Sequence, residues 1–231
     1  MVNTRWIDIA GPDGKFPGYL ALPPTGKGQA IIIIQEIFGV NEHIRSVAEQ
    51  YASDGYVVLA PDIFWRSKPH IELGYSADDM AKGIGFMEQV DMAKALGDIA
   101  ATAKTLRAMP EVTGKLAAVG YCFGGRLAYL SAANGSVDAA VPYYGGGIQN
   151  YLDQAGKIKT PILFHYAEND GNIPMSAVAN VKKSFAGRDN ATFFVYPGAD
   201  HGFNCWARGT YQQKAAALAH GRTLQFLAEN L

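Results

Sequence analysis

The chain lacks the signals that mark several specialised classes of protein. Its 231 residues include only two cysteines, Cys122 and Cys205, too few for the disulfide framework of a small secreted protein. The N-terminal segment has no basic region followed by a long apolar run, so no secretory signal is expected. The longest apolar stretch, residues 30–34, is too short to span a bilayer. These absences favour a cytoplasmic protein with free thiols.

An excess of charge of one sign is also missing. The formal net charge is -1, and no block of like charges occurs. Nucleic-acid-binding proteins usually carry a basic patch or stripe, and many membrane-surface proteins carry a polybasic segment. We therefore expect no nucleic-acid partner and no membrane partner, and we expect the chain to be a monomer.

What is present is the composition of an ordinary globular protein. Hydrophobic residues make up 48% of the chain and charged residues 18%. No repeat, low-complexity segment or domain boundary is visible. Because this length suffices for one large core, we expect residues 1–231 to form a single domain.

Strand-like and helix-like apolar patterns alternate along the chain. Strands are predicted at residues 5–10, 18–22, 29–35, 56–60, 115–120, 139–143, 162–166 and 192–196. Helices are predicted at residues 87–108, 124–133, 176–185 and 212–230, and another is capped by Asn41 and continues to about residue 53. This alternation predicts an α/β fold, a mostly parallel twisted sheet with helices on both faces. Functional groups of such sheets collect at the carboxyl ends of the strands.

The sharpest local motif surrounds Cys122, in Gly-Tyr-Cys-Phe-Gly at residues 120–124. It follows a predicted strand and opens a predicted helix, which is the context of the G-x-S-x-G nucleophile elbow, here with cysteine in place of serine. Glycines at both ends are needed because the turn brings backbone segments very close together. The helix N-terminus favours a thiolate. The alternative is a structural cysteine in a glycine-rich turn.

The order of residues after Cys122 supports the catalytic interpretation. Asp170 follows the strand at residues 162–166, and His201 follows the strand at residues 192–196. A triad in the order nucleophile, acid, histidine is typical of α/β-hydrolases. His201 would accept the thiol proton and Asp170 would orient His201. Glu168 and Asp200 are the alternative acids.

Glu36 stands directly after the strand of consecutive isoleucines. A carboxylate there is costly unless it is paired or lies in a cleft, and beside Cys122 it would oppose ionisation of the thiol. The loop after this strand commonly supplies one amide of an oxyanion hole. We therefore predict that the backbone N–H groups of Ile37 and Phe123 bind an oxyanion.

Together, these segments resemble the dienelactone hydrolase family. The resemblance is carried by residues 35–39 (QEIFG), 60–62 (APD), 120–125 (GYCFGG), 169–170 (ND) and 201–203 (HGF), and it extends over nearly the whole chain. It implies an α/β-hydrolase fold with a minimal cap, and hydrolysis of a small lactone or ester through a thioester on Cys122, without a metal or cofactor. It also implies that Glu36 keeps the resting thiol neutral and takes its proton when substrate enters.

The resemblance also suggests residues that contact the substrate. Well-known members of the family hold a substrate carboxylate with arginines, and the corresponding regions here contain Lys82 and Arg208. Because lysine is a point charge and not a bidentate fork, this departure leaves the substrate open. Aromatic side chains are expected to line the pocket, namely Phe38, Tyr144, Phe203 and Trp206.

Two other functions remain open at this stage. The same triad could transfer an acyl group or cleave a peptide, because a fold does not determine one function. The chain could also be a non-enzymatic thiol redox sensor with a hydrolase fold. A metal site is not expected, because no histidine shows ligand spacing with either cysteine.

Overall fold

The computed structural model describes residues 1–231 and contains an eight-stranded sheet in the order β1-β2-β4-β3-β5-β6-β7-β8. Strands β3 to β8 pair in parallel, whereas β2 pairs antiparallel with β1 and with β4. This arrangement confirms the predicted α/β class and the opening hairpin. The strands are β1 (Asn3–Gly11), β2 (Gly14–Leu22), β3 (Gly28–Ile34), β4 (Val57–Pro61), β5 (Val112–Tyr121), β6 (Ala139–Tyr143), β7 (Ile162–Ala167) and β8 (Ala191–Tyr196).

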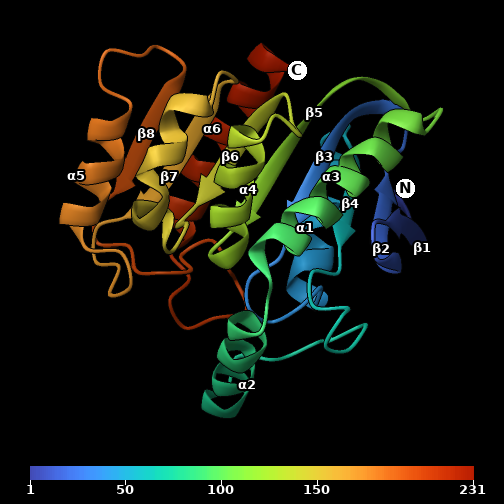
Figure 1. The fold of residues 1–231 in the computed structure, drawn as a ribbon, viewed down its shortest axis with the longest axis horizontal. Coiled ribbons are helices and arrows are strands. Elements are labelled where there is room, and N and C mark those ends of the chain that lie inside the picture. Colours follow the sequence, from blue (N-terminus) through green and yellow to red (C-terminus); the bar gives the residue numbers. More distant parts are fainter.

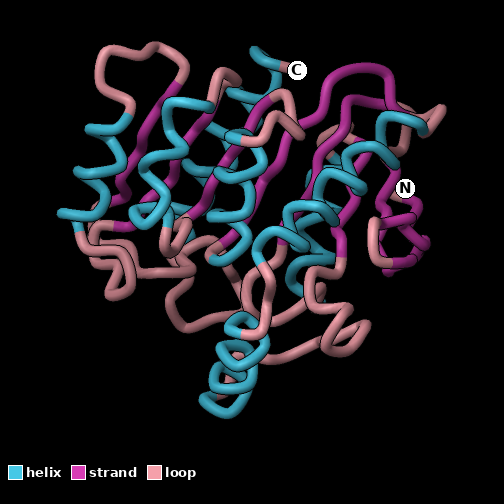
Figure 2. Tube along the Cα trace, in the orientation of Figure 1, coloured by secondary structure: helices cyan, strands magenta, loops and turns pink.

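Helices cover both faces of this sheet (Figures 1 and 2). In the view of Figure 1, α3, α4 and α5 lie in front of the strands, and α6 lies behind them. His220 of α6 contacts Asp54, the residue that ends α1, with 3.0 Å between Nε2 and Oδ2, so α1 and α6 share the rear face. The helices are α1 (Glu42–Ser53), α2 (Ala77–Glu88), α3 (Met92–Ala108), α4 (Phe123–Ala133), α5 (Met175–Ser184) and α6 (Gln213–Asn230), with a 3-10 segment η1 (Ile148–Lys157). None of the helices is long and apolar enough to cross a lipid bilayer.

The single helix predicted for residues 87–108 is wrong, because the chain breaks there into α2 and α3. Asp91 is the N-cap of α3, and its Oδ1 atom accepts hydrogen bonds from the N–H groups of Ala93 (2.9 Å) and Lys94 (3.1 Å). An aspartate in this position satisfies donors that a new helix leaves free, so it starts a helix instead of continuing one. The apolar pattern runs across the break and hides it. As a result α2 projects below the strand ends (Figure 1).

The start of α1 is tied to the segment that leads into α2. Asn41 caps α1 as predicted, and its Oδ1 atom accepts a hydrogen bond from the N–H of Ile44 at 3.2 Å. Its amide nitrogen donates to the carbonyl of Leu73 (3.0 Å) and to the hydroxyl of Tyr75 (3.1 Å). One side chain therefore holds together the two loops that follow β3 and β4, at the carboxyl edge of the sheet.

Candidate active site

Cys122 is the single residue between the end of β5 and the start of α4. Its backbone angles are φ 54° and ψ −113°, a region that residues other than glycine rarely adopt. The N–H of Cys122 donates to the carbonyl of Tyr143 in β6 at 3.0 Å, which holds the turn against the neighbouring strand. The thiol is only partly buried, so it is presented at the carboxyl edge of the sheet.

The glycines around Cys122 are required by close backbone contacts. A Cβ atom on Gly120 would lie 2.0 Å from the carbonyl oxygen of Gly124, and one on Gly124 would lie 2.2 Å from that of Ile34. These distances are far below van der Waals contact, so any side chain would push the helix away from the strands. The glycine pattern in the sequence therefore reports the packing of α4 onto β5 and β3.

His201 and Asp170 meet as the order of the chain predicts. The Nδ1 atom of His201 lies 2.7 Å from Oδ2 of Asp170, whose side chain is almost fully buried. The Oδ1 atom of Asp170 accepts hydrogen bonds from the N–H groups of Asn172 (2.8 Å) and Ile173 (3.0 Å). The carboxylate is thus held by its own turn and directs one oxygen at the imidazole.

The two alternative acids do not contact His201. Glu168 accepts a hydrogen bond from the N–H of Gly198 at 2.8 Å and so bridges two loops. Asp200 is exposed at the surface although it is adjacent to His201 in sequence. Asp170 is therefore the carboxylate that can orient the histidine.

The surroundings of His201 favour its charged form. Burial alone would lower its pKa, but the charge of the Cys122 thiolate and hydrogen bonds to Asp170 and Cys122 raise the pKa to about 10. Such a histidine stabilises a negative sulfur beside it. A protonated His201 can therefore stabilise negative charge that develops on the sulfur during the reaction.

Glu36 lies at the end of β3 with only 1% of its surface exposed. Burial raises the pKa of its carboxyl group, and the charges of Arg208 and His201 oppose that rise. Its Oε1 atom lies 3.4 Å from Nη1 of Arg208, while Oε2 has no hydrogen-bond partner. Arg208 is itself held over the rings of Phe38 and Tyr75, at 5.7 and 5.9 Å from their centroids. A carboxyl group that can gain a proton thus lies next to a fixed cation.

The two predicted oxyanion donors lie at the expected places. Ile37 is in the loop after β3, and its N–H donates to no backbone carbonyl or side chain of the chain. Phe123 is the first residue of α4, where helices leave N–H groups without an intrahelical acceptor. Both residues line the same pocket as Cys122.

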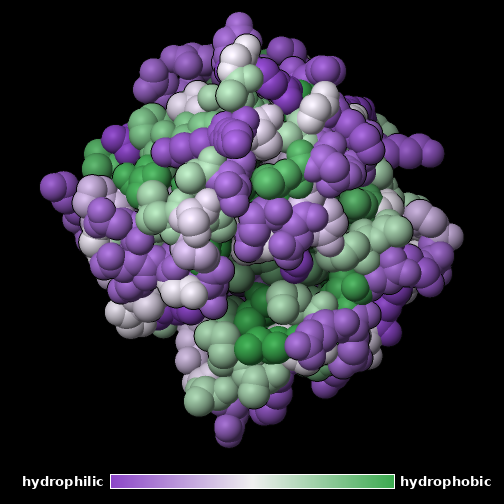
Figure 3. All heavy atoms as spheres, turned by 60° about the vertical axis from the view of Figure 1, so that its left-hand side comes forward, coloured by the Kyte–Doolittle hydropathy of each residue, from purple (hydrophilic) through white to green (hydrophobic).

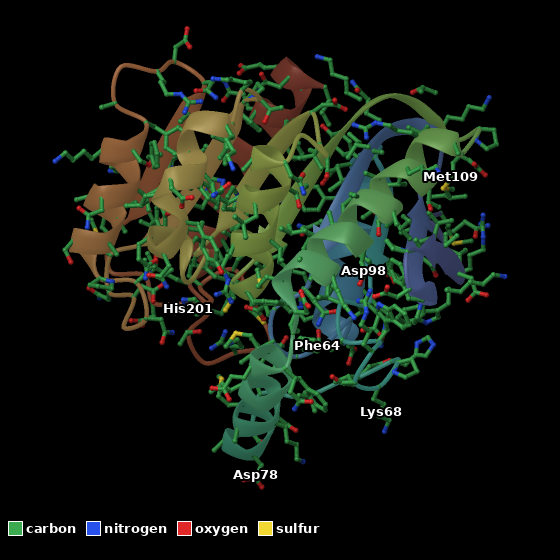
Figure 4. The ribbon with its side chains drawn as sticks, in the orientation of Figure 1. Phe64, Lys68, Asp78, Asp98, Met109 and His201 are labelled. Carbon is green, nitrogen blue, oxygen red and sulfur yellow. The ribbon has the colours of Figure 1, made fainter.

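This pocket has a volume of about 380 Å³, in the range of sites for small molecules. Figure 3 shows hydrophobic side chains around a hollow between the main body and the projecting lower end of the molecule. Figure 4 shows His201 at the same end of the sheet as α2, whereas Met109, which precedes β5, lies at the opposite end. The lining residues are Ile37, Phe38, Met80, Ile84, Met87, Cys122, Phe123, Arg126, Gly146, Gly147, Asn172, His201 and Arg208.

Of the side chains predicted to contact the substrate, two line the pocket and two are buried behind it. Phe38 and Arg208 line the pocket. Tyr144 and Phe203 are fully buried behind it: the Tyr144 ring lies 5.1 Å from the His201 ring and 5.3 Å from the Phe203 ring. Tyr144 therefore packs against the histidine, Phe203 packs against Tyr144, and neither of them lines the pocket.

Lys82 and Trp206 lie outside the pocket, contrary to the prediction. Lys82 is exposed and lines a separate depression, because it is two residues from Ile84 and therefore about 200° away around α2. Trp206 is 44% exposed and packs edge-to-face on His43, with ring centroids 4.4 Å apart, at the border of another pocket. Neither side chain is placed to contact a substrate at Cys122.

Sequence reasoning missed most of the pocket wall. Met80, Ile84 and Met87 come from α2, whose position depends on the break before α3. Arg126 could have been found, because it lies four residues after Cys122 and so on the same side of α4. The chain contains no group of three or more histidine, cysteine or acidic side chains arranged to hold a metal ion.

Comparison with known proteins agrees with this geometry. The model of the dienelactone hydrolase family matches residues 16–231. The chain belongs to the dienelactone hydrolase family. A carboxymethylenebutenolidase of Pseudomonas sp. (strain P51) is 34% identical over 222 residues, which cover 96% of this chain and 92% of the relative. Another, from Pseudomonas putida, is 34% identical over 227 residues, which cover 97% and 96% of the two chains.

Solved structures lead to the same family. One from Klebsiella pneumoniae subsp. pneumoniae, named for the dienelactone hydrolases, superimposes with a TM-score of 0.87 at 29% identity and covers 99% of each chain. The match confirms the α/β-hydrolase fold. Family membership also assigns the chain to the carboxylic ester hydrolases, the enzyme class predicted from the sequence.

Proposed function

We propose that this dienelactone hydrolase family member cleaves small lactones or esters through a thioester on Cys122. The observation that carries the proposal is a cysteine in a strained elbow, in one pocket with a histidine that is bonded to a buried aspartate at 2.7 Å. A strained backbone at a pocket is a common feature of nucleophiles. The roles of the individual residues follow from their contacts.

In the first half-reaction, the Cys122 thiol passes its proton to Glu36, and the sulfur, beside a protonated His201, attacks the carbonyl carbon of the substrate. The carbonyl oxygen becomes an oxyanion, which the N–H groups of Ile37 and Phe123 stabilise. Removing one such donor typically costs about 3–4 kcal/mol of transition-state stabilisation. His201 then gives its proton to the departing alkoxide oxygen, and the acyl group stays on sulfur as a thioester.

In the second half-reaction, His201 accepts a proton from water as the water oxygen attacks the thioester carbon. The tetrahedral intermediate collapses, the carbon–sulfur bond breaks, the carboxylic acid leaves, and Glu36 returns its proton to the sulfur. Asp170 keeps the imidazole oriented throughout. No redox step and no external cofactor is needed for this sequence.

Glu36 is the proposed proton acceptor that controls the resting thiol. Its buried carboxyl group has a raised pKa and a free Oε2 atom, so a proton on it is favourable. As a carboxylate, Glu36 opposes a thiolate nearby. When substrate enters, transfer of the proton from the Cys122 thiol to Glu36 would therefore leave the sulfur ready to attack.

The test is hydrolysis of 4-nitrophenyl acetate and of a small lactone by wild type and Cys122→Ala. We expect the variant to lose all turnover above background, and we expect wild type to show an acyl-enzyme mass at Cys122 after rapid acid quench. Wild-type turnover in Cys122→Ala would overturn the nucleophile assignment. The monomeric state and the cytoplasmic location stay predictions.

A further inference from the structure

Arg126 is a cation of the active-site pocket that has no carboxylate partner. Three positively charged or chargeable side chains line this pocket: Arg126, His201 and Arg208. His201 is paired with Asp170 and Arg208 with Glu36. None of the ion pairs of the chain includes Arg126, and no aspartate or glutamate lines the pocket. The free positive charge at this site is therefore that of Arg126.

The guanidinium of Arg126 is held in place although it lacks a partner. Its Cζ atom lies 5.1 Å from the centroid of the Phe123 ring, and its Nε atom is buried without a hydrogen-bond acceptor. A Cβ atom on Gly147 would lie 3.0 Å from Nη1, so the glycine leaves room for the guanidinium. A buried donor without an acceptor costs free energy, which an incoming anion would recover.

The pocket is divided by chemical character. Met80, Ile84 and Met87 form an apolar wall from α2. Arg126, the glycines at 146 and 147, and Asn172 form a polar part of the lining. A ligand that fills both parts needs a hydrocarbon portion and an anionic group.

We propose that Arg126 determines specificity by binding a carboxylate group of the substrate, while the hydrocarbon portion packs against α2. This inference rests on the proposed hydrolase function. Arg126 follows Cys122 by four residues, about one helical turn of 5.4 Å along α4. The carboxylate therefore lies a short carbon chain away from the carbonyl that Cys122 attacks. The substrate class is an ester or lactone of a short dicarboxylic acid.

Arg126 is better suited than Arg208 to bind the substrate carboxylate. Arg208 already interacts with Glu36 and lies against Phe38 and Tyr75. A carboxylate bound to Arg208 would have to compete with Glu36 and would repel it. At Arg126 a carboxylate meets an unpaired guanidinium that offers parallel N–H donors.

The experiment compares two esters that differ only in one charge, mono-4-nitrophenyl glutarate and 4-nitrophenyl pentanoate. Their rates are corrected for spontaneous hydrolysis and measured for wild type, Arg126→Met, Arg126→Lys and the control Lys82→Met. For Arg126→Met we expect kcat/KM of the glutarate ester to fall about 10- to 100-fold, mainly through KM, and that of the pentanoate ester to change less than about threefold. Arg126→Lys should keep part of the preference.

Two further observations separate charge recognition from a structural role. The wild-type preference for the glutarate ester should fall when the salt concentration is raised from about 0.02 to about 0.5 M, because salt screens the attraction between the carboxylate and Arg126. Lys82→Met removes a positive charge outside the pocket, so it should leave the preference unchanged. Equal ratios of the two esters in wild type and Arg126→Met, or an equal shift in Lys82→Met, would overturn the assignment and leave the hydrolase proposal intact.

A binding measurement covers the case in which wild type hydrolyses neither ester. That result contradicts the proposed function and does not itself address Arg126. Glutarate is then titrated calorimetrically into Cys122→Ala and into Cys122→Ala combined with Arg126→Met. We expect about tenfold weaker binding in the double variant. Equal affinities, or no binding to Cys122→Ala, would overturn the proposed carboxylate site.

Discussion

Replacing Asp170 by asparagine tests the contact between Asp170 and His201, because the geometry of the site determines how the new side-chain amide is oriented. In Asp170→Asn, the N–H groups of Asn172 and Ile173, now 2.8 and 3.0 Å from Oδ1, would hold the amide oxygen in the same place. The amide nitrogen would then face Nδ1 of His201, at the position that Oδ2 now occupies 2.7 Å away. Because this nitrogen is a donor, the imidazole proton must move to Nε2. A neutral imidazole whose Nε2 already carries a proton cannot accept one there from the attacking water in the second half-reaction.

The size of the effect follows from two losses. A hydrogen bond to a charged group contributes about 1.5–3 kcal/mol, or about 10- to 150-fold in rate. The wrong tautomer adds to this loss, and the same substitution in a serine protease triad lowers kcat about 10⁴-fold. We therefore expect kcat of Asp170→Asn on an activated aryl ester to fall by between about 100- and 10,000-fold.

Steady-state hydrolysis of 4-nitrophenyl acetate measures this fall, and two controls accompany it. Asp200→Asn changes an exposed carboxylate adjacent to His201 and should leave kcat within about twofold of wild type. The melting temperature of Asp170→Asn should change by only a few degrees, because the hydrogen bonds from the two N–H groups are kept. The reasoning is refuted if Asp170→Asn keeps more than about a third of wild-type kcat, or if Asp200→Asn loses as much activity as Asp170→Asn.

Two further predictions concern buried ionisable groups. Glu36→Gln removes a negative charge near the thiol, so Cys122 should react with iodoacetamide about tenfold faster at pH 7 without substrate. The kcat for esters should fall in the same variant. An unchanged rate of alkylation would contradict the role of Glu36. Burial, together with the charge of Arg208 for His43 and of Arg222 for His165, lowers the pKa of His43 to about 4 and that of His165 to about 3. The unfolded chain therefore binds more protons below pH 6.5, and each histidine should reduce the free energy of unfolding by about 2 kcal/mol between pH 7 and pH 5. Urea unfolding at both pH values should show about half of this combined loss removed in His43→Phe, and an unchanged loss would refute the assignment for His43.

Local sequence was sufficient for the elbow and for the region of the site. The motif at residues 120–124 combines neighbours in the chain, and its glycines are needed wherever a strand turns directly into a packed helix. Cys122, Asp170 and His201 follow the parallel strands β5, β7 and β8, and this brings them to one edge because parallel strands end on the same side of the sheet. These features depend on short segments and on a topology rule, so the sequence by itself determined them.

Other features depend on contacts between distant segments, and only the tertiary structure decided them. Asp170, and not Glu168 or Asp200, meets His201 because the turns after β7 and β8 direct their side chains differently. Similarly, the N-cap at Asp91 turns α2 outward, which puts its apolar face into the pocket and Lys82 outside. A residue type and its spacing show which side chains are available. The direction of each side chain follows from how helices and loops pack across the sheet, and that packing leaves Arg126 alone among the pocket cations without a carboxylate.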